Sequence, residues 1–250
     1  HAREVGDVDI RIRSREFEVI DNKTGDLKID TDLHLTGEVR APRLEGSADV
    51  RYGTINVSDV VERATADPYS TEETDIEQMK PATPSLFDRV DLTLGIGVPS
   101  SLVLKGSDIR AANAAIGIGD VNVTVGGAVQ LRKPPSQKMR LVGEANTVRG
   151  NYTFQGRRFN ILRDGRIRFS GTEELNPVLD LRAQRLISGI ETFVLVRGTL
   201  DRPELTSSSN PPLDQADILS LIIFNQPASQ LGEGQQVSLA EQAGALAGGY

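Results

Sequence analysis

Few residues of this 250-residue chain have the types and spacing that catalysis or metal binding requires. The chain has no Cys and only two His, so thiolate sites, Cys nucleophiles and most zinc and acid–base chemistry lack candidates. Gly117-Ile118-Gly119 lacks the third glycine and the following helix of a dinucleotide fingerprint. No nucleophile, base and orienting group belong together, so the sequence predicts no enzyme, no metal site and no cofactor.

Two pairs of carboxylates, Asp7 with Asp9 and Asp30 with Asp32, each lie on one face of an expected strand. Ca²⁺ binds such oxygens, but no neighbouring loop supplies the remaining ligands. We therefore expect a solvated strand face at both pairs. His34 occupies a polar position between two leucines, and we expect it to be exposed.

One basic cluster stands out in an acidic chain of net charge −7, and it consists of Arg149, Arg157, Arg158, Arg163, Arg166 and Arg168. It has two interpretations. The cluster binds anionic lipid headgroups or the acidic rim of a partner, or it is the outer face of a sheet where Arg alternates with Glu and Asp. The pI near 5.0 argues against nucleic acid as the main partner.

The elements that position these residues are strands, because apolar and polar residues alternate from Val8 to about Leu205. We count about fourteen strand-like runs. The predicted fold is mainly β, a long antiparallel amphipathic sheet curled into a β-groove with an apolar interior. Aromatic residues are 4% of the chain and Trp is absent, which favours a groove that holds something flexible over a tightly filled sandwich core.

The apolar positions of these runs are the predicted lining of the groove. They are Val90, Leu92, Leu94, Ile96, Leu102, Leu104, Val121, Val123, Val125, Val129, Leu131, Leu141, Phe154, Phe159, Ile161, Ile167, Phe169, Leu179 and Leu181.

The short Gly-, Asn- and Asp-containing segments between the runs predict hairpin turns of odd length. If one face is apolar throughout, the two strands of a hairpin must place their apolar residues opposite each other. A three-residue turn at 163–165 pairs Ile161 with Ile167, and Gly165 then supplies the left-handed residue of a type I turn with a G1 bulge. The same parity holds for Val125 with Val129 across Gly126-Gly127, and for Val98 with Leu102.

Two segments interrupt the alternation, which gives a groove domain at 1–210 and a C-terminal helical segment at 211–250. Residues 58–88 are an acidic, Pro-containing insertion with a short helix after Ser58, and they form either a solvated loop or a docking arm.

The sequence of the C-terminal segment predicts two short helices. Asp214 caps a helix that runs to about Phe224, and the capping box Ser238–Glu241 opens an Ala-rich second one. The apolar positions of the first helix cover more than half of its circumference. We therefore expect it to lie across the C-terminal end of the groove near Phe169 and Leu181, as a structural end cap or as a mobile plug. The apolar positions of this first helix are Ile218, Leu221, Ile222 and Phe224.

Several strings within residues 90–250 resemble the C-terminal region of TamB-type translocation and assembly module proteins, which belong to the AsmA-like, bridge-like lipid transfer group. The strings are Gly150–Phe159, Gly165–Gly171, Asn176–Asp180, Val196–Thr199, Pro203–Leu205, Ser208–Leu213 and Asp217–Leu221. The resemblance implies a taco- or gutter-shaped β-groove in the periplasm of a Gram-negative cell envelope, an N-terminal inner-membrane anchor and a TamA/BamA-type outer-membrane barrel as partner. It carries no catalytic residues.

Two functions follow from this resemblance and from the apolar lining. The chain is a conduit that carries phospholipid acyl chains between the inner and outer membranes, or it is a scaffold or chaperone for the assembly of outer-membrane β-barrel proteins and autotransporters. The chain begins at His1 without a targeting signal or a stretch long enough to span a bilayer, so we expect it to be part of a longer polypeptide whose anchor lies elsewhere.

Overall fold

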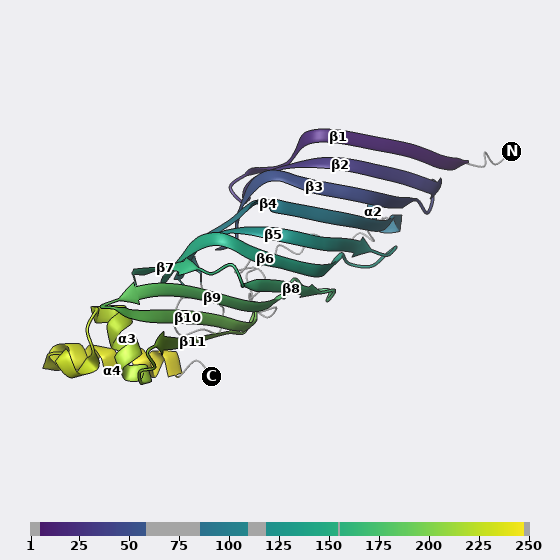
Figure 1. Cartoon of the computed structure of the whole chain (residues 1–250). Coiled ribbons are helices and arrows are strands. Elements are labelled where there is room, and N and C mark those ends of the chain that lie inside the picture. The colour runs from purple at the N-terminus through teal and green to yellow at the C-terminus, as the bar shows by residue number, and fades with distance from the viewer. Residues whose placement is uncertain (1–5, 59–85, 110–118, 155, 248–250) are drawn as a thin grey trace.

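A computed structural model describes residues 6–58, 86–109, 119–154 and 156–247 of the chain. The described strands form one mixed sheet (Figure 1). They are β1 (Asp7–Asn22), β2 (Gly25–Glu38), β3 (Arg43–Asn56), β4 (Asp91–Ile109), β5 (Gly119–Lys133), β6 (Arg140–Phe154), β7 (Arg157–Ile161), β8 (Arg166–Ser170), β9 (Val178–Ile187), β10 (Ile190–Thr199) and β11 (Pro203–Asn210).

The strands lie side by side in chain order, from β1 at one edge of the sheet to β11 at the other (Figure 1). The helices of the C-terminal segment lie at the β11 end. They are α3 (Gln215–Phe224), the 3-10 helix η1 (Ala228–Gln230) and α4 (Glu233–Ala247). The predicted mainly β, amphipathic sheet is confirmed. No helix of the described residues is long and apolar enough to cross a membrane.

One strand pair differs from the predicted antiparallel sheet. β3 and β4 are parallel, with Arg43 opposite Asp91 and Asn56 opposite Lys105. A parallel pair needs a crossover connection of a dozen residues or more, and the stretch between Asn56 and Asp91 provides that length. Residues 59–85, where the helix after Ser58 was expected, lie outside the described residues. The connection ends in α2 (Leu86–Arg89) just before β4.

The three predicted hairpins are wrong, because each is an interruption within one continuing strand. Gly126 and Gly127 lie in the middle of β5, whose two halves both pair with β4 and β6. Pro99 and Ser100 form a bulge inside β4, where the register with β5 shifts between Val98 and Leu102. The backbone of Ser100 is left-handed, with φ of 58°. In the part of the chain that the structure describes, eleven strands thus stand where about fourteen runs were expected.

The third interruption separates β7 from β8, which both lie between β6 and β9 and run in the same direction. Ile161 pairs with Ala183, and Ile167 pairs with Ala145 and Leu179, so Ile161 and Ile167 do not face each other. Gly165 does not have the left-handed backbone predicted for it. β7 and β8 therefore occupy one strand position that is broken by a bulge at 162–165.

The first C-terminal helix begins as predicted, since the carboxylate of Asp214 accepts the backbone N–H of Asp217 at 2.8 Å. The helix ends at Asn225, which has a left-handed backbone with φ of 60°. The predicted start of the second helix at Ser238 is wrong, because α4 begins at Glu233 and Ser238 lies inside it. The residues of the expected capping motif lie inside the helix. At the start of the helix, the backbone N–H groups of Gln235 and Gln236 donate to the carbonyl of Gly232.

Candidate ligand-binding face

Cross-strand register collects the apolar side chains of successive strands into rows on one side of the sheet. We call this side the apolar face. Because strand side chains alternate between faces, residues opposite one another share a face. One row joins Ile12, Leu33, Gly46, Leu94, Leu131 and Leu141. A second row joins Ile10, Leu35, Leu44 and Leu92 and ends at Lys133.

The register and the side-chain contacts place the predicted lining residues of β4 to β9 on this one face. Val123, Val125 and Ile167 form a cluster that also contains Leu102, Leu104, Val121, Ile161, Phe169, Leu179 and Leu181. Phe154 and Phe159 belong to a second cluster beneath α3. Leu92 is buried, while Leu94, Ile96, Val129, Leu131 and Leu141 are half-buried. Val90 precedes β4, and its carbonyl accepts a bond from the Lys133 ammonium at 3.4 Å.

The apolar face changes from open to covered along the sheet. Ile12 of β1 is 46% exposed and Phe17 is 57% exposed, whereas Phe159 of β7 is fully buried and Val194 of β10 nearly so. Nothing in the described residues covers the face over β1, and α3 covers it over β7, β9 and β10. Exposed apolar surface of this kind marks a site that binds another apolar molecule.

Helix α3 packs on the apolar face through Ile218, Leu221 and Ile222, each 1% exposed or less. The Arg157 side chain fastens it, because an Nη2–H donates to the carbonyl of Ile223 at 2.7 Å. Burial in the cluster beneath α3 also raises the pKa of Tyr152 of β6, because burial removes the water that would stabilise its phenolate.

The expected position of α3 needs two corrections. Phe169 and Leu181 lie in the cluster outside α3, because α3 covers the opposite ends of the strands near Phe154 and Phe159. Phe224 packs away from the sheet, together with Leu219 of the same helix, against Leu231 and Leu239 of the η1–α4 segment. The helix is apolar around most of its circumference because the sheet lies on one side of it and this segment on the other.

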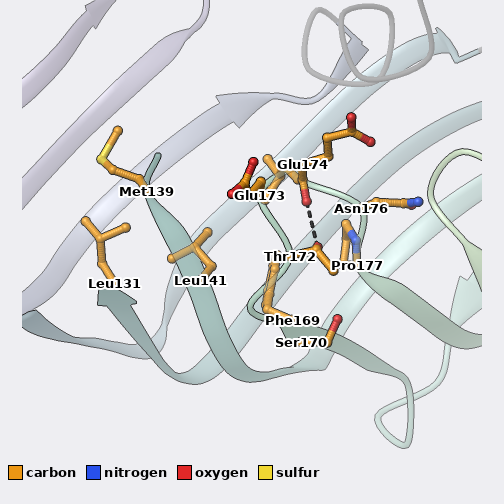
Figure 2. A pocket seen from close by; sticks show the side chains of 11 residues that line it. Leu131, Met139, Leu141, Phe169, Ser170, Thr172, Glu173, Glu174, Asn176 and Pro177 are labelled. Carbon is orange, nitrogen blue, oxygen red and sulfur yellow. Dashed lines mark hydrogen bonds between the residues drawn. The ribbon is translucent and has the colours of Figure 1, made fainter. Parts of the chain in front are cut away.

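A pocket of about 230 Å³ lies where the row of Leu131 and Leu141 ends (Figure 2). Its far wall is the segment between β8 and β9, which includes Thr172, Glu174 and Pro177; in Figure 2 the Glu174 carboxylate points away from the leucines. The residues that line it are Leu131, Met139, Leu141, Phe169, Ser170, Thr172, Glu173, Glu174, Leu175, Asn176 and Pro177.

Hydrogen bonds hold this wall at both ends. The Glu173 carboxylate accepts from Arg140 of β6 at 3.0 Å. The Asn176 amide donates to the Asp201 carboxylate at 2.5 Å, and its carbonyl oxygen accepts the Asp201 N–H at 3.1 Å. Inside the wall, the Thr172 hydroxyl donates to the carbonyl of Glu174 at 2.8 Å. Desolvation, and then the nearby Glu174 charge, raise the pKa of Asp201.

The opposite face of the sheet carries ion pairs between strands. Asp32 pairs with Arg13 at 3.0 Å and Asp30 with Arg51 at 2.9 Å, and the Asp9 carboxylate accepts a hydrogen bond from Nε2 of half-exposed His34 at 2.7 Å. These pairs occupy Asp9, Asp30 and Asp32, three of the four carboxylates that were considered for Ca²⁺. The described residues contain no group of three metal-ligating side chains.

The basic cluster is divided between the two faces. The register places Arg149, Arg158 and Arg166 opposite polar residues on the outer face, and Arg168 there pairs with Glu144 at 3.5 Å. Arg157 instead holds α3 from the apolar face. The described positions favour the outer-face interpretation for most of the cluster.

Sequence reasoning missed part of the apolar face. Val194 and Val196 of β10 are buried in it, but the neighbouring Phe193 and Leu195 are also apolar, so this part of β10 shows no alternation. The missed residues of β1–β3 do alternate, and their pattern could have identified them. They include Ile10, Ile12, Leu33, Leu35, Leu44 and Val50.

A family model described as TamB C-terminal domain matches residues 1–250 of the chain. The motifs described above cover a smaller part, from residue 90 onwards. No curated protein matches the chain. The matched family is a transport and assembly module of the cell envelope, not a known enzyme family, and it works with TamA-type outer-membrane proteins.

Proposed function

The chain belongs to the TamB C-terminal domain family, and we propose that its apolar face carries the acyl chains of phospholipids between the inner and outer membranes. Membership gives the chain a TamB-like role in the translocation and assembly module and a place in outer-membrane biogenesis. The lipid-carrying role is our proposal. In it, the sheet is the wall of a groove in the periplasm, the longer protein is anchored in the inner membrane, and the headgroups stay in water.

The observation that carries the proposal is the row of apolar positions, interrupted only by Gly46, that runs from Ile12 of β1 to Leu141 of β6 at the pocket. The six strands from β1 to β6 are separated by five spacings of about 4.8 Å, so the row is roughly 24 Å long. That exceeds the reach of one acyl chain, which is about half of a hydrocarbon core of ~30 Å. Each buried methylene contributes about 0.8 kcal/mol, so a chain of a dozen or so methylenes gains enough to leave water.

The similarity of the contacts along the apolar face supports transport of a lipid over tight binding at one position. The row from Ile12 to Leu141 consists of Ile and Leu side chains and one glycine, Gly46, and contains no charged residue. A hydrocarbon that moves from strand to strand exchanges one aliphatic contact for a similar one. No single position then binds it much more strongly than its neighbours.

The proposal is tested by photocrosslinking residues at adjacent positions of β4 that point to opposite faces. Leu94 lies on the apolar face and Thr93 on the other, and both are half-buried. We expect the purified chain, incubated with phospholipid vesicles, to capture lipid from position 94 and not from position 93. Equal capture from both positions would overturn the lipid-carrying role. Native mass spectrometry of the untreated chain identifies any lipid that copurifies.

A second candidate function is supported by the open edge of the sheet. Within the described residues, the sixteen residues of β1 pair with β2 alone, so one row of backbone N–H and C=O groups is available to another strand. A scaffold for outer-membrane β-proteins would use this edge to pair with client strands. Replacing Arg11 by Pro removes one N–H from β1, and a second such change at Arg13 removes another. Loss of client-peptide binding with unchanged lipid capture favours the scaffold.

A further inference from the structure

The pocket at the end of the Leu131–Leu141 row has the features of a built binding site, as opposed to a gap between loops. Its floor comes from the sheet, and its opposite wall is the 172–177 segment. That wall is fastened at one end by Arg140 to Glu173 and at the other by Asn176 to Asp201. Both fastenings come from strands or turns outside the segment, so the walls keep their separation without a ligand.

The interior of the pocket is hydrocarbon and its rim is charged. Leu131, Leu141 and Phe169 line the inside. Glu173 and Glu174 lie at the rim, where the Glu173 charge is matched by Arg140 and the Glu174 side chain is exposed. A ligand that suits both parts has an apolar chain and a cationic group near its end.

The pocket is also continuous with the rest of the apolar face. Leu131 and Leu141 lie opposite each other at the end of a row that begins at Ile12. Rows nearer the other ends of the strands run beneath α3, where Phe159 and Leu221 are fully buried. An apolar chain on the sheet therefore reaches the pocket without displacing the helix.

We propose that this pocket binds the acyl chain of a phospholipid whose headgroup carries an ammonium group, with the ammonium beside Glu174. The inference rests on the proposed lipid-carrying function and names the place where a chain leaves or enters the sheet. Phospholipids with a net negative headgroup bind less well, because Glu174 repels them. The walls of the pocket accept the end of the chain, while the Ile12 end of the row remains open.

Photocrosslinking residues at three exposed apolar positions test the proposal. Met139, 50% exposed, lines the pocket, whereas Val142, 40% exposed, lies a short way along the chain on the opposite face and is the matched control. Ile12 reports on the far end of the same row. The chain is incubated with vesicles of equal phosphatidylethanolamine and phosphatidylglycerol, and captured lipid is identified by mass spectrometry.

We expect capture at Met139 and Ile12 and none at Val142. Capture at Ile12 without capture at Met139 overturns the pocket and leaves the lipid-carrying function standing. Absence of capture at both Met139 and Ile12 overturns the pocket and the function together. Capture at Val142 equal to that at Met139 also overturns the pocket. Circular dichroism confirms that each variant is folded, as expected for changes at exposed side chains.

The headgroup preference has its own readout at Met139. An exposed charge pair changes binding by roughly threefold, so phosphatidylethanolamine should be captured about threefold more than phosphatidylglycerol. Glu174→Gln should bring the ratio close to one, and Glu204→Gln, an exposed carboxylate on β11, should leave it unchanged. A ratio near one in the unmodified chain, or one that favours phosphatidylglycerol, overturns the ammonium preference.

Discussion

Thr147 of β6 and Gly165 bond to each other twice across the bulge that separates β7 from β8. The Thr147 N–H donates to the Gly165 carbonyl at 2.9 Å, and the Gly165 N–H donates to the Thr147 hydroxyl at 3.1 Å. The same hydroxyl donates to the carbonyl of Leu162 at 2.5 Å. One buried side chain thus replaces the ladder bonds that β7 and β8 lose where they are interrupted.

Gly165→Ala should destabilise the sheet because of close approach, without any contribution from a left-handed backbone. A Cβ at position 165 would lie 2.6 Å from the Thr147 hydroxyl oxygen and 3.1 Å from a Leu181 methyl carbon. We expect a loss of about 1–3 kcal/mol in the free energy of unfolding, measured by urea denaturation. Gly232→Ala is the control, since a Cβ there meets nothing within 4 Å.

Coupling between the two residues distinguishes this mechanism from a general loss of flexibility. Thr147→Ala removes the hydroxyl oxygen that the new Cβ would meet, so the double variant should be less destabilised than the sum of the two single variants. Strict additivity of the two losses would contradict the close-approach explanation.

The sequence identified the apolar face more reliably than the connections within it. Alternation predicts which residues share a face, and the register and contacts put Leu94, Val125 and Ile167 on one side of the sheet. The parity that suggested odd hairpin turns is equally the parity of a strand that simply continues, since Val125, Gly127 and Val129 alternate without a change of phase. A Gly-Gly or Asp-Gly pair in such a strand is compatible with a turn or with a bulge.

Two other features depend on partners that are distant in sequence. The parallel pairing of β3 with β4 cannot be read from either strand, because both have the same alternation as antiparallel strands. The pocket depends on Asp201 and Arg140 holding the 172–177 segment, and neither residue is near it in sequence. The Asn176–Asp180 motif supported the family resemblance, but it did not predict that residues 172–177 form a wall of the pocket.

Charges introduced on the apolar face should have effects that follow exposure. Ile12→Asp should leave the chain folded, because that side chain is 46% exposed, and should reduce lipid capture. Val123→Asp should lower the free energy of unfolding by several kcal/mol, because Val123 is 4% exposed and no cationic partner belongs to its cluster. Urea denaturation measures the free energy of unfolding of both variants, and photocrosslinking measures the lipid capture.

The neighbouring Asn122→Asp is the matched control for Val123→Asp. Asn122 is exposed and lies on the outer face opposite Lys105 and Asn151, so its change should have little effect. Similar losses from Asn122→Asp and Val123→Asp would show that the two faces of β5 do not differ as described.

The pKa of Asp201 predicts a pH dependence of stability. Because the folded-state pKa is raised, folding favours the protonated form. The contribution of Asp201 to the free energy of unfolding is therefore fully present below the unfolded-state value of about 3.9 and is lost as the pH rises through the folded-state pKa. Asp201→Asn lacks this titration. We expect the unmodified chain to lose stability relative to Asp201→Asn as the pH rises from about 4, in urea denaturation; parallel pH profiles would contradict this.

Helix α3 is expected to act as a structural end cap. Burial of a side chain such as Leu221 or Ile222 contributes about 1.5–3 kcal/mol, so the three residues of α3 that pack on the sheet contribute a large part of a typical stability of roughly 5–15 kcal/mol. Deletion of 214–224 should therefore expose Phe159 and its neighbours and cause aggregation. A mobile plug would instead leave a folded chain that exchanges lipid faster.

Leu221→Ala separates these outcomes with a smaller change than the deletion. Leu221 is fully buried between the helix and the sheet, so its truncation should lower the free energy of unfolding by about 2–5 kcal/mol and leave the rate of lipid exchange nearly unchanged. Val237→Ala on α4 is the control, because Val237 is 61% exposed and its truncation should change neither quantity. Arg157→Met removes the bond to the Ile223 carbonyl, and it should speed hydrogen exchange in α3 before it affects the rest of the sheet. If Leu221→Ala accelerated lipid exchange at unchanged stability, α3 would be a plug and the end-cap role would be wrong.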